Sequence, residues 1–380
     1  MNKLKKIGIS ALAGTLVSLS AAQAGGVSVS GNMELSYVNL NHEKVSGNKL
    51  GMNKNLSFGS SGDVTDGGGV TWTSTVVMGD TANLSSASMS LNMGGIATLA
   101  YDSGTGGYGA NAVDNVVPTA WEEIDYGLST GIVDVGAVSK SKGVINLTIK
   151  APVAGTGISL SYVSRVGGAH IADGGNDAAA TGGRGLDAVI DLVNYSSAHF
   201  GMRLGFAAET EIKEVSCASL QQEKVVGFSC SNGFKDNPYA GTAYTTLALG
   251  PIHMGVQATF NDPMEAASTG MANRRAIVAG AAFVVGDTLS ISYGKAWQKN
   301  KYNNAMRGTA YDSGGFGDEK SLSGAKGPNQ YESIGYRGWS AAINLGPVAL
   351  KATRNGVDGM GENGSSSPKK HSEINLSMAF

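Results

Sequence analysis

The segment Ile374-Asn375-Leu376-Ser377-Met378-Ala379-Phe380 ends the chain and alternates large apolar residues with polar or small ones. Alternation with a period of two predicts a β-strand that presents its apolar residues on one face. An aromatic last residue is typical of a final barrel strand that pairs with the first strand and meets lipid on one face. The terminal segment therefore favours a closed β-barrel in a membrane.

The other end of the chain has the pattern of a secretory signal peptide. Its positive charges, apolar run and small cleavage residues are Lys3, Lys5 and Lys6, then residues 7–22, then Ala22-Gln23-Ala24. We expect residues 1–24 to be removed and residues 25–380 to form one domain. Export combined with an aromatic-terminated strand predicts the outer membrane of a Gram-negative bacterium.

Composition agrees with a barrel. Cleavage leaves 356 residues. No segment among them has the roughly 18 consecutive apolar residues that a membrane helix needs. Only 15% of the chain is charged, and a membrane protein without membrane helices must close its strands into a barrel. The mature chain keeps 25 Lys and Arg against 30 Asp and Glu, a net charge near −5 that argues against nucleic-acid binding.

Period-two alternation continues along nearly the whole chain. In the first predicted strand, Val27, Val29 and Met33 share one face, and polar residues share the other. About seventeen segments of this kind can be counted. Single-chain bacterial barrels have even strand numbers, so we expect an all-β, transmembrane antiparallel barrel of about 16 strands, with 18 as the next choice. Residues 184–195 and 274–285 are apolar on both faces, which predicts packing against another subunit or against an inward-folded loop.

The connections between these segments alternate in length, as in outer-membrane barrels. Tight links are expected on the periplasmic side and long polar connections on the outside. The tight links include Gly94-Gly95, Gly250-Pro251, Gly286-Asp287 and Gly346-Pro347, and the long connections cover residues 103–131, 167–183, 211–239, 300–330 and 357–370.

With these features the chain resembles the general diffusion porins of Gram-negative bacteria, particularly the alphaproteobacterial branch, from Gly25 to Phe380. The resemblance implies a homotrimer of 16-stranded barrels, each a water-filled pore narrowed by an inward-folded third external loop. It also implies contact with outer-membrane lipid and lipopolysaccharide, and a role for Phe380 as an assembly signal for the barrel-assembly machinery. The enterobacterial Pro-Glu-Phe-Gly-Gly loop motif is absent, so constriction residues are assigned by position.

The first long connection, from Ser103 to about Gly131, is the expected constriction loop. Its acidic residues are Asp114, Glu122, Glu123 and Asp125. Basic residues expected to face the lumen from the strands are Lys150, Arg165, Arg203, Arg337 and Lys351. Acids on a loop opposite bases on the wall would set up a transverse field that orients polar solutes. The alternatives are a solvated external loop and bases that lie at the rim, away from any constriction.

Three other residues stand out. Lys295 falls on the apolar face of its segment, where it marks an interfacial lysine, a subunit contact or a bulge. Cys217 and Cys230 most simply form one disulfide that closes a loop in an oxidising compartment. The alternative reading of this pair, a metal or nucleophilic site, lacks a nearby histidine.

No pattern in the sequence supports an enzyme, a cofactor or a metal site. Residues 104–109 match G-x-G-x-x-G, a motif that indicates dinucleotide binding only where a helix follows it. No helix pattern follows these residues, so we reject the dinucleotide interpretation. The five histidines are dispersed. We therefore predict passive diffusion of small hydrophilic solutes and ions. The alternatives are a solute-specific channel of the same fold, for phosphate, sugars or polyols, and a structural or adhesive outer-membrane barrel.

Overall fold

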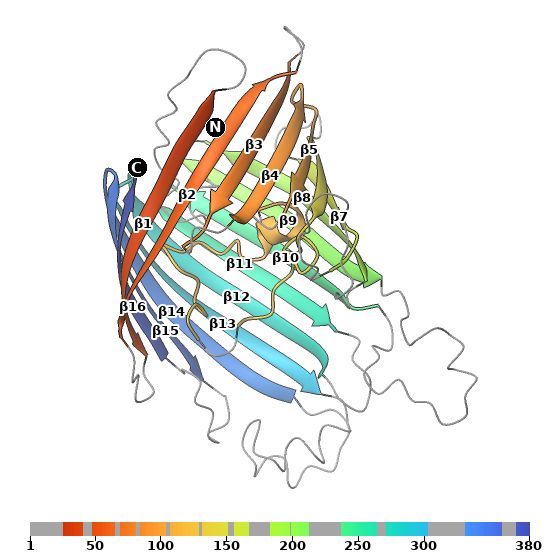
Figure 1. Ribbon diagram of the computed structural model, residues 1–380. Coiled ribbons are helices and arrows are strands. Elements are labelled where there is room, and N and C mark those ends of the chain that lie inside the picture. Colours follow the sequence, from red (N-terminus) through yellow and green to blue (C-terminus); the bar gives the residue numbers. More distant parts are fainter. Residues whose placement is uncertain are drawn as a thin grey trace, which may run out of the picture.

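The structure, a computed structural model, describes residues 26–40, 48–64, 69–80, 84–103, 107–128, 131–150, 156–166, 183–197, 199–212, 237–263, 271–302, 331–358 and 370–380. Sixteen antiparallel strands form one closed barrel, in which each strand pairs with its neighbours in sequence and the first pairs with the last. The ribbon in Figure 1 shows the strands tilted around a common axis. The prediction of an all-β barrel with about 16 strands is confirmed.

The strands differ in length around the barrel, and those next to the first long connection are the shortest. They are β1 (Val27–Leu40), β2 (Leu50–Asp63), β3 (Val70–Met78), β4 (Leu84–Met93), β5 (Ala97–Asp102), β6 (Val144–Lys150), β7 (Gly157–Val163), β8 (Arg184–Ser196), β9 (Phe200–Ile212), β10 (Tyr239–Leu249), β11 (Ile252–Asp262), β12 (Met271–Val285), β13 (Leu289–Tyr302), β14 (Tyr331–Leu345), β15 (Val348–Asp358) and β16 (Lys370–Ala379). A 3₁₀ helix, η3 (Gly109–Val113), follows β5.

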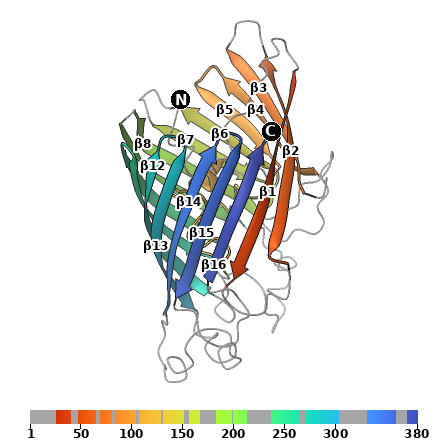
Figure 2. The same ribbon diagram turned by 90° about the vertical axis from the view of Figure 1, so that its left-hand side faces the viewer.

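The barrel closes where the terminal strand meets the first one, as the sequence predicts. Met33 of β1 lies opposite Met378 of β16, and Leu35 lies opposite Leu376. Figure 2 shows β14, β15, β16, β1 and β2 side by side. Phe380 exchanges two backbone hydrogen bonds with Gly31, of 2.9 and 3.0 Å. A Cβ on Gly31 would lie 2.6 Å from the Phe380 ring, so only glycine leaves room for this aromatic end.

Alternation along each strand separates an outer apolar face from an inner polar face. On β15, Leu350 points outward and is 46% exposed, whereas the next residue, Lys351, points inward and is buried. Large apolar side chains are exposed on every strand, an arrangement that suits a barrel standing in lipid. In the part of the chain that the structure describes, no helix has both the length and the hydropathy to cross a bilayer.

The two ends of the barrel differ. At one end, which we call the short-turn end, hairpins such as that at Gly94 and Gly95 are tight. Both glycines have positive φ, +60° and +81°, which glycine adopts without steric cost. The strand ends that the long connections join lie at the opposite end, which we call the long-loop end. The C-terminus lies at the short-turn end, where Ala379 bonds to Pro347 in the β14–β15 turn.

The predicted connection 103–131 is too short. Val133 and Val135, just beyond it, alternate like strand residues, but they belong to the connection between β5 and β6, which spans residues 103–143. Both side chains are buried, at 5% and 0% exposure. Their alternation reflects a segment lying against a surface, which buries every second side chain without pairing in the sheet.

Candidate functional site

The connection of residues 103–143 is called the interior loop below, and its described residues, 103, 107–128 and 131–143, lie inside the barrel. Its backbone amides bond to side chains that point inward from strands far away in sequence. Val116 N donates to Gln257 Oε1 on β11 at 3.0 Å. Farther along, the loop donates from Ala120 to Ser292 on β13 (2.8 Å) and from Trp121 to Ser340 on β14 (3.1 Å). The loop therefore follows the inner wall from strand to strand.

The interior loop then turns back along the same wall. At the turn, the Asn355 amide of β15 donates to the carbonyls of Glu123 and Tyr126, at 2.8 and 3.0 Å. On the return path, Val133 N donates to Gln298 on β13 at 2.7 Å. Val138 N then donates to Glu209 on β9 at 3.0 Å. These contacts hold both arms of the loop against β9–β15, so the described part of the loop follows one side of the lumen.

Glycines on the wall provide the space that the loop occupies. Inward positions on β11 to β14 carry Gly255, Gly280, Gly294 and Gly338. A Cβ on each would lie 2.6 to 3.1 Å from the loop, against Pro118, Val117 or Ile124. The wall is thus shaped for close approach of the loop, a signal that the sequence analysis did not use.

Apolar side chains fix the loop to the wall on its buried side. Val113 and Val135 pack with Val189 of β8 and Tyr244 of β10. Ile124 packs with residues of β13, β14 and β15, and Val278 of β12 packs against this cluster. The apolar inward positions of residues 184–195 and 274–285 therefore contact the interior loop, one of the two explanations that the sequence left open.

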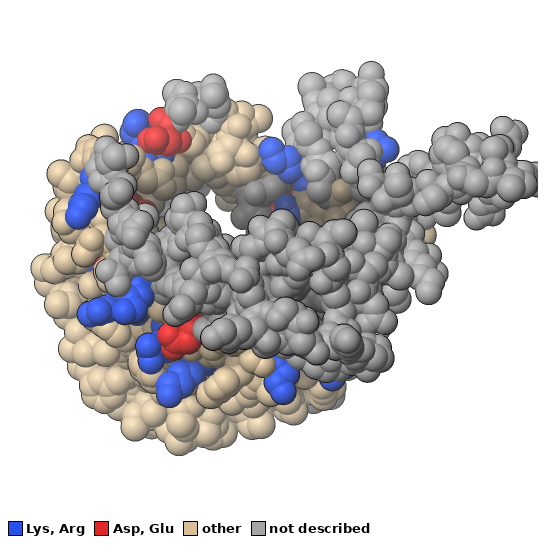
Figure 3. All heavy atoms as spheres, turned by 90° about the horizontal axis from the view of Figure 1, so that it is seen from below, with Lys and Arg blue, Asp and Glu red and all other residues tan. Residues whose placement is uncertain are grey.

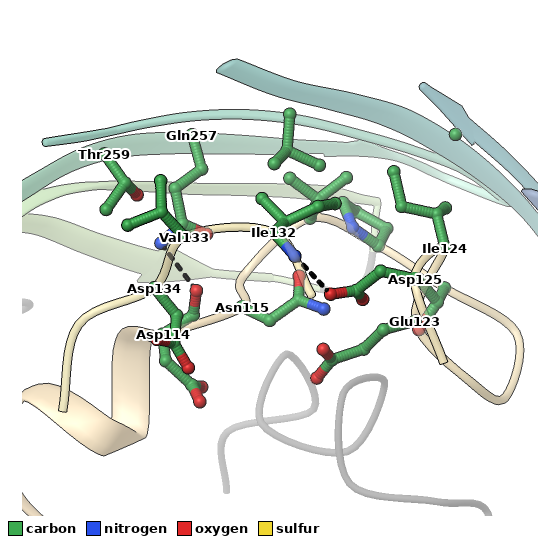
Figure 4. A pocket seen from close by; sticks show the side chains of 15 residues that line it. Asp114, Asn115, Glu123, Ile124, Asp125, Ile132, Val133, Asp134, Gln257 and Thr259 are labelled. Atoms are coloured by element: carbon green, nitrogen blue, oxygen red, sulfur yellow. Dashed lines mark hydrogen bonds between the residues drawn. The ribbon is translucent and has the colours of Figure 1, made fainter. Parts of the chain in front are cut away.

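The opposite side of the loop is charged and faces the lumen. Figure 4 shows Asp114 close to Asp134, and Glu123 close to Asp125, around the side chain of Asn115. Lys140 bonds Asp114 at 2.8 Å and also pairs with Asp134. Asp125 accepts a hydrogen bond of 2.7 Å from Ile132 N, which fixes the loop turn. Three of the four predicted acids thus come together, with Asp134 and Lys140 as partners that the sequence analysis missed.

Burial changes the charge of these acids. Burial, together with repulsion from Asp125, raises the pKa of Glu123 to about 7. Burial raises the pKa of Asp114 as well, but Lys140 opposes the shift. The pKa of Lys140 is raised because its two carboxylate partners outweigh burial. The loop thus carries acids that titrate near neutral pH beside a lysine that stays charged.

Glu122, the fourth predicted acid, lies in a different environment at the loop turn. Burial, together with the charge of Glu373 on β16, raises its pKa to about 7. Lys351 of β15 lies close by, fully buried and 3.5 Å from Glu34 of β1. Its ammonium also lies 5.6 Å from the centre of the Trp121 ring. This group fastens the turn of the loop to β1, β15 and β16.

The wall across the lumen from the described part of the loop carries hydroxyls and amides. Inward positions on β1 to β6 include Ser30, Asn32, Asn55, Ser57, Thr73, Thr75, Ser88, Ser90, Thr98 and Thr148. Among the inward residues of these six strands, the only Lys or Arg is Lys150, at the short-turn end of β6. The expected wall of basic residues opposite the acidic loop is therefore wrong for this part of the barrel.

The other predicted bases lie elsewhere. Arg203 points inward but pairs with Asp191 on β8, at 2.9 Å, and lies over the Tyr244 ring. Arg165 follows the end of β7 at the long-loop end. The prediction that Arg337 faces the lumen is wrong, because its side chain points outward and is 57% exposed. Arg337 is two residues from Trp339 in the same strand, so the two side chains lie on the same outward face.

Two further predictions are not tested by this geometry. Cys217 and Cys230 lie outside the described residues, as does the predicted signal peptide, residues 1–24. No group of three or more His, Cys, Asp or Glu side chains within the described ranges is arranged to hold a metal ion.

Solved structures share this barrel, although no protein-family model and no curated protein matches the chain. The trimer form of OmpT, an outer membrane protein of Vibrio cholerae, matches with a TM-score of 0.54 and 9% identity, over 94% of this chain and 100% of that chain. OmpF of Salmonella typhi in complex with daunomycin matches with a TM-score of 0.56 and 8% identity, over 94% and 98%. An anion-selective porin from Comamonas acidovorans matches with a TM-score of 0.53 and 11% identity, over 94% of this chain and 100% of that chain.

The chain has the porin fold. At these identities the likeness concerns the path of the backbone and not the residues of the lumen. The charges of the interior loop and of the wall opposite it are therefore properties of this chain.

Proposed function

We propose that the chain forms a water-filled channel in the outer membrane of a Gram-negative bacterium, through which small hydrophilic solutes and ions diffuse passively. The interior loop supports this proposal, because its described residues narrow the lumen from one side and a hydroxyl-lined wall on β1 to β6 lies opposite them. Figure 3, a view from the long-loop end, shows an opening within the ring of the barrel wall. Polar walls on both sides of such a passage favour water and hydrated solutes over apolar ones.

The charge of the loop gives the channel a preference for cations. The described residues of the loop contain Asp114, Glu122, Glu123, Asp125 and Asp134 against Lys140 and Lys142. The facing wall adds no base except Lys150, at its short-turn end. A negative potential in a narrow lumen raises the local concentration of cations and lowers that of anions.

Trimeric assembly is part of the proposal. Outer-membrane location is supported by the exposed apolar wall and by the predicted signal peptide, residues 1–24. A trimer is supported by the likeness to the trimer form of Vibrio cholerae OmpT. Three equal closing steps per insertion in a planar bilayer are the expected sign of this assembly.

Planar-bilayer recording in a salt gradient tests the proposal. We expect stable conductance steps and a reversal potential whose sign reports cation preference. Absence of steps from correctly folded protein would favour the structural or adhesive barrel. Liposome swelling with a graded set of neutral sugars completes the test. Rates that fall with solute size and do not saturate support the general channel, and saturation with one sugar would favour a solute-specific one.

A further inference from the structure

Two basic residues lie directly opposite each other on the outer wall. Lys295 of β13 and Arg337 of β14 are paired in the ladder, and both side chains point outward. Like charges in this position repel each other and destabilise the strand pair. The next partner of Arg337 is Gly356 of β15, which is in turn opposite Lys370 of β16. A single row across four strands therefore carries three cations around a position without a side chain.

A fourth cation and several aromatic rings surround this row. Arg354 points outward from β15 two residues before Gly356, opposite Trp339 of β14. Trp339 is 44% exposed and lies opposite Tyr293 of β13. Lys295, Arg337, Arg354 and Lys370 are called the basic patch below. Neighbouring strands are about 4.8 Å apart, so these long side chains can reach a common ligand above Gly356.

The patch is part of a larger imbalance on the outer wall. Outward Lys and Arg on the described strands are Arg275, Lys295, Lys299, Lys301, Arg337, Arg354 and Lys370 on β12 to β16, and Lys54 and Arg184 elsewhere. Outward acids on the same strands are Asp262 and Asp358. Asp358 lies 3.4 Å from Arg337, but both side chains are more than half exposed, so this pair compensates little. Lys and Arg also outnumber Asp and Glu around the rim in Figure 3.

The patch lies close to the apolar band of the barrel. On β13, only Leu289, Ile291 and Tyr293 point outward below Lys295, counted from the short-turn end. On β11, five apolar side chains follow one another before a charged residue: Ile252, Met254, Val256, Ala258 and Phe260. The first charged outward position therefore lies closer to the short-turn end on β13 than on β11, which would place the patch at the level of lipid headgroups.

We propose that the basic patch binds the phosphate group of a phosphorylated lipid in the membrane leaflet on the long-loop side. The inference rests on the proposed function only in requiring that the barrel stands in a bilayer. Phosphate would relieve the repulsion between Lys295 and Arg337, and a guanidinium can hold two of its oxygens at once. Trp339 and Tyr293 would lie beside the headgroup, where amphipathic rings are stable.

Charge complementarity selects lipid over a second copy of the chain. A contact between copies would have to offer acids to the patch, and the described strands present only Asp262 and Asp358 outward. Asp358 already lies beside the patch, so it cannot serve as a remote complement. A phosphorylated lipid supplies the missing negative charge from the surroundings.

The test measures lipid binding by the full-length barrel, folded in a neutral detergent, with native mass spectrometry. The probes are diphosphoryl lipid A and the same lipid without phosphates. We expect the wild-type barrel to bind the diphosphoryl lipid more tightly than the lipid without phosphates. This comparison uses the wild-type protein alone. Replacing Arg337→Gln and Arg354→Gln together should weaken that binding roughly thirtyfold, about fivefold for each charge removed.

The matched control removes two outward cations elsewhere on the wall, Lys54→Gln with Arg184→Gln, and should leave binding of the diphosphoryl lipid unchanged. Equal binding of both lipids by the wild type, or equal loss in the two double variants, would overturn the proposal. A change in oligomeric state without a change in lipid binding would assign the patch to a subunit contact instead. Conductance is measured separately, so phosphate-dependent binding without a pore would refute the channel and leave the lipid site.

Discussion

Gly294 of β13 lies against Ile124 of the interior loop, so closely that a Cβ on the glycine would come within 2.8 Å of Ile124 Cγ2. The same Cβ would also lie 3.4 Å from the carbonyl oxygen of Ala279, so it has little room to move. The position of the loop thus depends on the absence of a side chain on the wall. This relationship links the sequence of a distant strand to the width of the lumen.

Replacing Gly294→Val should push the turn of the loop away from β13. Overpacking of this kind costs about 1–3 kcal/mol, which is enough to shift the loop between arrangements. We expect single channels with altered mean conductance and added current noise. Gly335→Ala is the control, because a Cβ there has nothing within 4 Å. If both variants conducted like the wild type, the loop would not set the width of the passage.

Neutralising the lumen side of the loop should weaken cation preference. Glu123→Gln with Asp134→Asn removes two carboxylates, and a unit charge about 8 Å from a passing ion contributes about 0.5 kcal/mol in water. The same charge attracts the cation and repels the anion, so at pH 9, where Glu123 is ionised, the cation-to-anion permeability ratio should fall roughly fivefold per charge. Reversal potentials in a potassium chloride gradient measure this ratio. Asp358→Asn, on the outer wall, should leave it unchanged, and an equal effect there would argue against a lumenal origin.

Cation preference should also depend on pH. Burial raises the pKa of both Glu122 and Glu123 to about 7. Raising the pH from 5 to 9 passes through these values and removes up to two protons, which makes the loop more negative. Reversal potentials should therefore show stronger cation preference at pH 9 than at pH 5. The double variant Glu122→Gln with Glu123→Gln should have a much flatter pH profile. A profile that stayed as steep would assign the titration to other groups.

Lys351 should contribute strongly to stability, because it is fully buried and pairs with Glu34 across β16 at 3.5 Å. Removing one partner of a buried ion pair leaves the other charge uncompensated, so Lys351→Met should lower the free energy of unfolding by about 3 kcal/mol. Tryptophan fluorescence reports the change, since Trp121 lies beside the ammonium. Adding Glu34→Gln should recover part of the loss. Additive losses would mean that the two side chains do not interact.

The fold was accessible from the sequence because a barrel repeats one local rule. Alternation such as that of Ile374, Leu376 and Met378 is a property of neighbouring residues, and it needs no knowledge of distant contacts. The aromatic end at Phe380 then predicted the pairing of the last strand with the first, which the ladder between β1 and β16 confirms. The presence of an early acidic loop followed from its length and composition alone.

The arrangement of side chains in the lumen could not be predicted in the same way. Val133 and Val135 alternate like a strand but line the buried side of the loop, because a surface selects the same period as a sheet. Lys351 points inward as predicted, yet the loop buries it completely. Which carboxylates meet, and which side of the lumen the loop follows, depends on glycines such as Gly294 that are more than 150 residues from the loop.

Sequence alone thus predicted the barrel, a strand number of about 16 and the faces of most strands, since these depend on period-two patterning and on closure in lipid. Only the tertiary structure decided where the interior loop lies, which acids face the lumen, and that Lys295, Arg337 and Lys370 share one row on the outer wall. The physical reason is register. Residues on different strands become neighbours through the offset of each ladder, which no local pattern encodes.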